Sequence, residues 1–144
     1  MSNTTPFDPR NRKLAVLKGG PGSEHDVSLR SGASVAAALR AAGADVTEIE
    51  LTGTEIEIPE GTELVFNLIH GTFGEDGRLQ GILDGRGIPY TGEGAEESHV
   101  AFDKILTKRR CLKAGVPSAR FERFIDACAP WPNDWKPPVV LKPT

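Results

Sequence analysis

The sequence predicts an α/β protein built on a doubly wound, mostly parallel sheet. Short apolar runs typical of buried strands, at 13–18, 45–51 and 63–69, alternate with stretches whose apolar residues recur at helical spacing. Glycine-rich loops follow the first and the third of these runs. A chain of 144 residues that is 38% apolar and 26% charged is long enough and apolar enough to form a globular domain with its own core.

The elements are expected in a regular order. The first strand leads through a loop into a helix over 27–42, which Gly43 ends because helix C-termini favour a left-handed residue there. After the strands 45–51 and 63–69, the remaining elements of this part are a helix whose apolar face is Leu79, Ile82 and Leu83, a short strand at 88–91 and a short helix at 95–102.

The character of the chain changes at Asp103. Basic residues crowd a helix over 104–113, which Gly115 and Pro117 end, and a strand is expected at 120–125. Lone strands cannot bury their own faces, so a last apolar run at 139–144 indicates the beginning of a second domain. The predicted organisation is a flexible tail over 1–12, an N-terminal α/β domain over 13–115, and the start of another domain over 116–144.

Composition excludes several classes of function. The net charge is −3 and no basic block is present, which argues against nucleic acid or an anionic membrane as the main partner. No apolar stretch approaches the roughly 20 residues of a membrane span, so the protein is expected in the cytoplasm. The two cysteines, Cys111 and Cys128, are expected to be free thiols, and the three histidines lack metal-ligand spacing.

The first loop, residues 19–28, connects a strand to a helix and is suited to a small polar ligand. Three glycines in four positions permit close approach of the backbone, and the helix offers unpaired N–H groups at its start. Glu24 stands where a phosphate-binding loop would have a lysine or bare backbone. A carboxylate at this place would repel phosphate and attract an ammonium group.

The second loop, residues 70–77, begins with His70 and again follows a strand. Ligands of doubly wound sheets bind beyond the carboxyl ends of the strands, so both loops are expected to face one crevice. A zwitterionic amino acid needs an anion for its ammonium group and a donor for its carboxylate. Glu24 and His70 offer one of each.

The ordered motifs along residues 13 to 144 resemble the N-terminal part of the D-alanine–D-alanine ligases, which are ATP-grasp enzymes. Each motif is weak alone, but their order and spacing all agree. The matching residues are Gly19-Gly20 with Ser23-Glu24-His25-Asp26-Val27-Ser28, His70-Gly71 with Gly74-Glu75-Asp76-Gly77 and Leu79-Gln80-Gly81, Ile88-Pro89-Tyr90-Thr91-Gly92, Asp103-Lys104 with Thr107-Lys108, and Leu141-Lys142-Pro143.

The resemblance implies ATP-dependent joining of two D-alanines through a D-alanyl phosphate, with magnesium or manganese, for peptidoglycan synthesis. It implies a Rossmann-like domain preceding the ATP-grasp fold, then the start of the central ATP-grasp domain, and a homodimer. By resemblance, Glu24 binds the ammonium group of the first D-alanine with help from Ser28, and His70 lies near its carboxylate. Lys104 and Lys142 contact ATP phosphates, and no metal ligand is assigned here.

In this family the ATP-covering loop, the adenine pocket and the magnesium ligands come after the lysine-proline pair. We therefore expect the chain alone to be unable to catalyse the reaction. Two other functions stay open. One is a D-alanine–D-lactate ligase, because the residues that select the second substrate mostly lie beyond Thr144 in the family. The other is a non-catalytic module that binds an amino acid or a nucleotide.

Each candidate residue also has a simpler interpretation. Glu24 could be an acid favoured by the helix dipole, His70 a brace for its loop, and Ser28 plain helix surface. Glu75 and Asp76 are expected to order the second loop rather than to take part in chemistry. The basic residues of 104–113 other than Lys104 are expected to form a solvated helix face.

Overall fold

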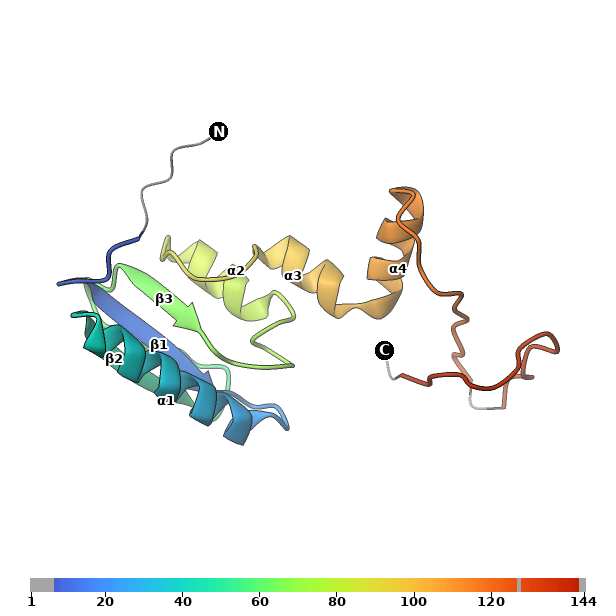
Figure 1. Cartoon of the computed structure of the whole chain (residues 1–144), viewed down its shortest axis with the longest axis horizontal. Coiled ribbons are helices and arrows are strands. Elements are labelled where there is room, and N and C mark those ends of the chain that lie inside the picture. Colours follow the sequence, from blue (N-terminus) through green and yellow to red (C-terminus); the bar gives the residue numbers. More distant parts are fainter. Residues whose placement is uncertain (1–6, 127, 143–144) are drawn as a thin grey trace. The chain divides into compact units, whose positions relative to one another are not determined.

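A computed structural model describes residues 7–126 and 128–142 (Figure 1). The described residues group into two compact units, one ending at Phe102 and the other beginning at Asp103. The predicted division into domains after residue 115 stays a prediction.

A parallel sheet of three strands forms the centre of the first unit, in the order β2-β1-β3. β1 spans Lys13–Gly19, β2 spans Asp45–Leu51 and β3 spans Leu64–Asn67. The central strand β1 pairs in parallel with both neighbours. The predicted α/β fold with parallel strands is confirmed.

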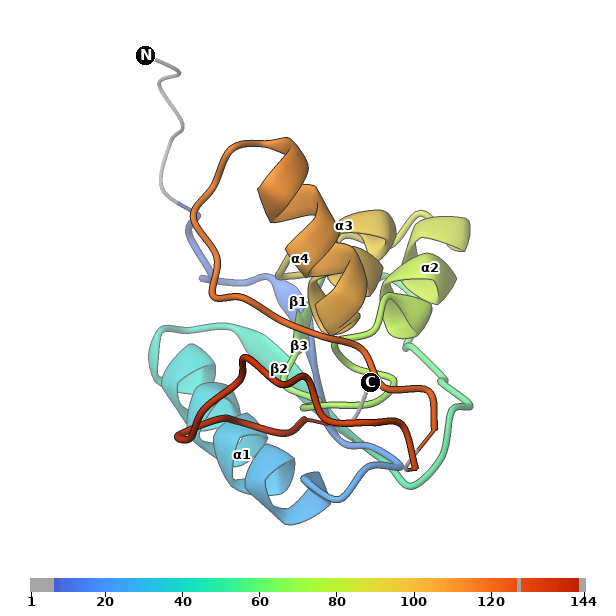
Figure 2. The ribbon, with the colours of Figure 1, turned by 90° about the vertical axis from the view of Figure 1, so that its right-hand side faces the viewer.

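Helices cover both faces of this sheet, as Figure 2 shows for α1 and α2. Alternate residues of β1 point to opposite faces because the side-chain period of a strand is two. Leu14 and Val16 belong to one buried cluster, with Ala36 of α1 (His25–Ala41). Ala15 and Leu17 belong to the other, larger cluster, to which Leu79 and Leu83 of α2 (Arg78–Gly85) also belong.

Local sequence signals account for several element ends. The predicted strand 45–51 and the predicted helix over 95–102, which is α3 (Ala95–Phe102), have the predicted bounds. Gly43 has a φ of +92°, the left-handed conformation expected after the end of α1. None of the helices in the described part of the chain is long and apolar enough to cross a bilayer.

Three predicted strands are not formed, and the strand predicted at 63–69 is shortened to β3 (Leu64–Asn67). The strand predicted at 88–91 is reduced to a single bridge between Val65 and Tyr90, where Pro89 has no N–H to donate. Residues 120–125 and the described residues 139–142 form neither helix nor strand. A strand needs a neighbouring strand for its backbone hydrogen bonds, and no described strand pairs with either segment. Residues 143 and 144 lie outside the described residues.

The second unit begins with α4 (Lys104–Lys113). The Asp103 carboxylate caps this helix and accepts hydrogen bonds from the backbone N–H groups of Ile105 and Leu106. The segment that follows contains an aromatic group in which Trp131 stacks on Phe124 and meets the edge of Trp135. Both cysteines, which lie in this unit, are free thiols, as predicted.

Candidate functional site

The two loops singled out in the sequence begin at the carboxyl ends of adjacent parallel strands. The first loop follows β1 and the second follows β3, three residues after Asn67. Their backbones come close together, because a Cβ added to Gly22 would lie 3.7 Å from the carbonyl oxygen of His70. The two loops therefore lie together at one edge of the sheet, while the expectation that they face one crevice stays a prediction.

Glu24 occupies the N-cap position of α1, but its side chain makes no capping hydrogen bond. The exposed carboxylate instead lies against the backbone of the second loop. A Cβ added to Gly71 would stand only 2.6 Å from Glu24 Oε2, so a side chain there would contact the carboxylate directly. This places the acid of the first loop beside the residue that follows His70.

Ser28 is fully buried and connects the first loop to the segment between β3 and the second loop. Its hydroxyl accepts a hydrogen bond from the backbone N–H of Gly19 at 2.8 Å and donates to the carbonyl oxygen of Leu68 at 2.6 Å. The interpretation of Ser28 as plain helix surface is wrong, because this face of α1 packs against the ends of β1 and β3. Its only proton is given to Leu68, so Ser28 supports the geometry of both loops.

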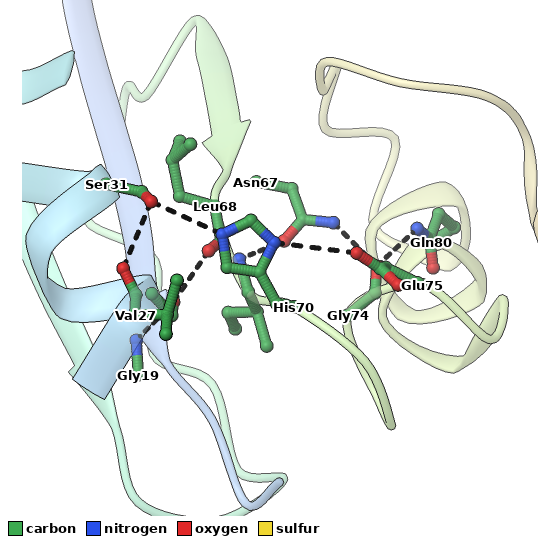
Figure 3. Close-up of polar contacts among 11 residues, drawn as sticks. Gly19, Val27, Ser31, Asn67, Leu68, His70, Gly74, Glu75 and Gln80 are labelled. Carbon is green, nitrogen blue, oxygen red and sulfur yellow. Dashed lines mark hydrogen bonds and ion pairs between the residues drawn. The ribbon is translucent and has the colours of Figure 1, made fainter. Parts of the chain in front are cut away.

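The imidazole of His70 lies between two oxygen atoms from different elements (Figure 3). Nε2 lies 3.4 Å from the hydroxyl oxygen of Ser31 on α1, and Nδ1 lies 3.5 Å from Oε1 of Glu75 in the second loop. The side chain of His70 is 33% exposed. The ring is therefore accessible but contacted on both sides.

The second loop is held by hydrogen bonds within itself. Asp76 accepts hydrogen bonds from the backbone N–H groups of Phe73 and Arg78 and forms an ion pair with the Arg78 side chain at 2.8 Å. Burial alone would raise the pKa of Asp76, but these hydrogen bonds together lower it below its usual value. The predicted role of Asp76 in ordering the loop is confirmed.

A second set of contacts ties this loop to its flanking elements. The carbonyl oxygen of Gly74 accepts hydrogen bonds at 2.8 Å from the side-chain amides of both Asn67, at the end of β3, and Gln80, on α2. Gly74 has no room for a side chain, because an added Cβ would overlap the carbonyl oxygen of Ile69. The loop that presents His70 is thus fixed at both ends.

The two predicted ATP-contacting lysines belong to the second unit. Lys104 is the first residue of α4. Lys142 is exposed in a segment without regular secondary structure. Of the predicted site residues, Glu24, Ser28 and His70 come together in the first unit, while a role for the two lysines stays a prediction.

The arrangement in the first unit can bind but offers no evident nucleophile. A carboxylate and an imidazole on neighbouring loops suit a small zwitterion, whose ammonium and carboxylate groups would each meet a partner. Within residues 7–126 and 128–142, no cluster of three or more histidine, cysteine, aspartate or glutamate side chains is placed to hold a metal ion.

Sequence reasoning missed Ser31 and the contact of Glu75 with His70. Ser31 lies three residues after Ser28 on the same side of α1, a helical spacing that could have associated it with the site. Glu75 was expected only to order its loop. Its contact depends on how the loop turns between Gly71 and Gly74, for which the sequence gives no signal.

The sequence is similar to a known family over most of its length. Residues 52–93 match a family model described as "D-ala D-ala ligase N-terminus". The D-alanine–D-alanine ligase of Methylacidiphilum infernorum is 44% identical over 133 residues, which cover 92% of this chain and 43% of the relative. The D-alanine–D-alanine ligase of Moorella thermoacetica is 46% identical over 111 residues, which cover 76% of this chain and 36% of that relative. The chain thus spans less than half the length of these curated relatives.

Solved structures agree with the sequence comparisons. The D-alanine-D-alanine ligase of Aeromonas hydrophila superposes with a TM-score of 0.71 at 34% identity, covering 78% of this chain and 50% of that one. The Bacillus anthracis enzyme, solved in complex with ATP, gives a TM-score of 0.68 at 30% identity. The superposition covers 74% of this chain and 36% of the Bacillus anthracis chain. In sequence and in fold, this chain corresponds to the N-terminal portion of the D-alanine–D-alanine ligase family.

Proposed function

We propose that this chain is the part of an ATP-dependent D-alanine–D-alanine ligase that binds the first D-alanine. The relatives named above carry that activity in their names, and their similarity extends over most of the chain. In the complete reaction, ATP transfers its terminal phosphoryl group to the carboxylate of the first D-alanine. The amine of the second D-alanine then attacks the acyl phosphate, and inorganic phosphate leaves as the peptide bond forms.

The observation that carries the proposal is the position of Glu24 beside the His70-Gly71 segment. The Glu24 carboxylate lies against Gly71, and the imidazole of the preceding residue is partly exposed. The ammonium group of D-alanine would pair with Glu24, and its carboxylate would lie near His70. The two charged ends of a small amino acid are then held at the edge where adjacent strands end.

The residues of this chain act in the proposal by binding and by orientation. Ser28 fixes the spacing of the two loops through its hydrogen bonds to Gly19 and Leu68. Lys104 and Lys142 would contact ATP phosphates, because a lysine ammonium group is a compact positive charge that suits them. The further parts of the proposal, a magnesium or manganese ion with the ATP, a homodimer and a cytoplasmic location, rest on the family resemblance.

The decisive experiment is ATP-dependent phosphate release by the full product of the gene that encodes this chain. With magnesium present, D-alanine and L-alanine are compared at equal concentration. Release with the D isomer alone is expected. Release with neither isomer, from protein shown to be folded, would refute the ligase activity.

Two variants connect the activity to the site. Glu24→Gln removes the negative charge but keeps the shape, and we expect the KM for the first D-alanine to rise about 10- to 100-fold, as for the loss of a hydrogen bond to a charged group. His70→Ala should also weaken use of the first D-alanine. Unfolding midpoints serve as the control, because Glu24 is exposed and its replacement should leave them nearly unchanged. Unaltered kinetics in both variants would refute the site assignment.

A further inference from the structure

The ring of His70 is contacted by two side chains to which the proposed function gives no role. Ser31 approaches from α1 and Glu75 from the second loop, at opposite nitrogens of the ring (Figure 3). The two residues are far apart in the sequence and have no described contact with each other. In the structure, both residues contact the side chain of His70.

Ser31 defines which ring nitrogen donates. Its hydroxyl proton is directed at the carbonyl oxygen of Val27, at 3.0 Å, so the oxygen is left to act as an acceptor toward His70. Nε2, at 3.4 Å from that oxygen, is then the nitrogen that carries a proton. This contact anchors one edge of the ring to a helix.

Glu75 faces the other edge of the ring. Its Oε1 lies 3.5 Å from Nδ1, an ion-pair distance rather than that of a hydrogen bond. Its backbone N–H donates to the carbonyl oxygen of Gly71 at 3.0 Å, which fixes the start of the side chain relative to the loop. Nδ1 therefore makes no short hydrogen bond to Glu75 and stays open to an atom of a ligand.

We propose that Ser31 and Glu75 are positioning residues that hold the imidazole of His70 toward the carboxylate of the first D-alanine. The identity of that ligand rests on the proposed function, whereas the orientation of the ring rests on the contacts alone. Two anchors at opposite nitrogens oppose rotation of the ring about its side-chain bonds. A ligand carboxylate therefore meets a group that is already oriented, and less entropy is lost on binding.

The test uses Ser31→Ala, Glu75→Ala and Glu75→Gln, with two matched controls. Ser34→Ala removes a hydroxyl of the same helix that makes the same kind of bond, to the carbonyl oxygen of Arg30 at 3.0 Å, but has no contact with His70. Glu60→Ala removes an exposed glutamate from a turn elsewhere in the first unit.

Two measurements are made on each variant of the full gene product. The first is the position of the His70 ring nitrogen resonances in protein with isotope-labelled histidine, assigned by their absence from His70→Ala. The second is the KM for the first D-alanine and the kcat, both from phosphate release. We expect Ser31→Ala and Glu75→Ala to move the ring resonances and to raise KM about two- to five-fold, the effect of losing one partly exposed polar contact, with kcat nearly unchanged. Glu75→Gln should recover part of the loss, because glutamine keeps a polar side chain of the same shape beside Nδ1.

The results distinguish a failure of this proposal from a failure of the proposed ligase activity. Ring resonances that stay in place in both alanine variants would overturn the proposal, as would a KM no higher than in the matched controls. If the unaltered protein releases no phosphate with D-alanine, the ligase activity is refuted, and the ring resonances alone decide whether Ser31 and Glu75 position His70.

Discussion

Gly71 and Gly87 have nearly the same left-handed backbone, with φ of +67° and +66°, but their surroundings differ. A Cβ on Gly71 would stand 2.6 Å from Glu24 Oε2, whereas nothing lies within 4 Å of a Cβ on Gly87. The pair therefore separates the cost of the backbone conformation from the effect of displacing Glu24.

Replacing Gly71 by alanine should weaken D-alanine use in the full gene product beyond its effect on stability. Both Gly71→Ala and Gly87→Ala should destabilise by about 1–2 kcal/mol, because an L-residue is strained at this φ. Only Gly71→Ala should also raise the KM for the first D-alanine, because the added methyl group displaces the Glu24 carboxylate. Urea unfolding and steady-state kinetics on both variants check this. An equal KM in the two variants would contradict a role for the contact.

Replacing Ser28 by alanine should destabilise the first unit strongly. The change leaves the buried N–H of Gly19 and the partly buried carbonyl of Leu68 without their partner, and a buried group in this state costs about 1–3 kcal/mol. We expect a total loss of about 2–4 kcal/mol in the free energy of unfolding, measured by urea titration at constant m. Ser34→Ala is the matched control and should change stability by less than about 0.5 kcal/mol, since its hydroxyl is exposed. A similar small change for Ser28→Ala would show that the two loops do not depend on this hydroxyl.

Much of the fold could be predicted because its signals are local. The apolar runs at 13–18 and 45–51 and the glycine at 43 depend only on nearby residues, and each predicted its element closely. The segment 120–125 carries an equally apolar pattern but forms no strand. A strand is completed by hydrogen bonds to another strand, and this information does not lie within the segment itself.

The candidate site was predictable to the extent that topology determines it. Loops after adjacent parallel strands must lie near each other, which was enough to bring Glu24 and His70 to one edge. The burial of Ser28 depends on which face α1 turns to the sheet, and the contact of Glu75 with His70 depends on the path of the second loop. Neither follows from residue type or spacing.

Asp76 should make the stability of the second loop depend on pH in the acid range. Its pKa is lower in the folded chain than the unfolded value of about 3.9, so the carboxylate contributes stability above that value and loses it as the pH falls through the folded pKa. Asp76→Asn should therefore destabilise by about 1–3 kcal/mol at pH 7, by loss of charged hydrogen bonds. The difference from the unaltered protein should shrink below about pH 4. Urea unfolding across this range tests the expectation, with Glu57→Gln as an exposed control; a difference independent of pH would contradict it.

Gly77 and Gly81 lie one turn apart at the start of α2 and should respond oppositely to alanine. Gly77 has a φ of +90°, and an added Cβ would overlap the carbonyl oxygen of Ala95, so Gly77→Ala should cost more than about 3 kcal/mol. Gly81 lies within the helix, is exposed, and an added Cβ would meet only the Cβ of Ala95 at an ordinary 3.9 Å. Gly81→Ala should therefore stabilise by about 0.5–1 kcal/mol, because alanine loses less backbone entropy than glycine in a helix. Thermal unfolding of both variants measures the contrast. A loss of stability in Gly81→Ala would mean that α2 and α3 pack more tightly than this contact indicates.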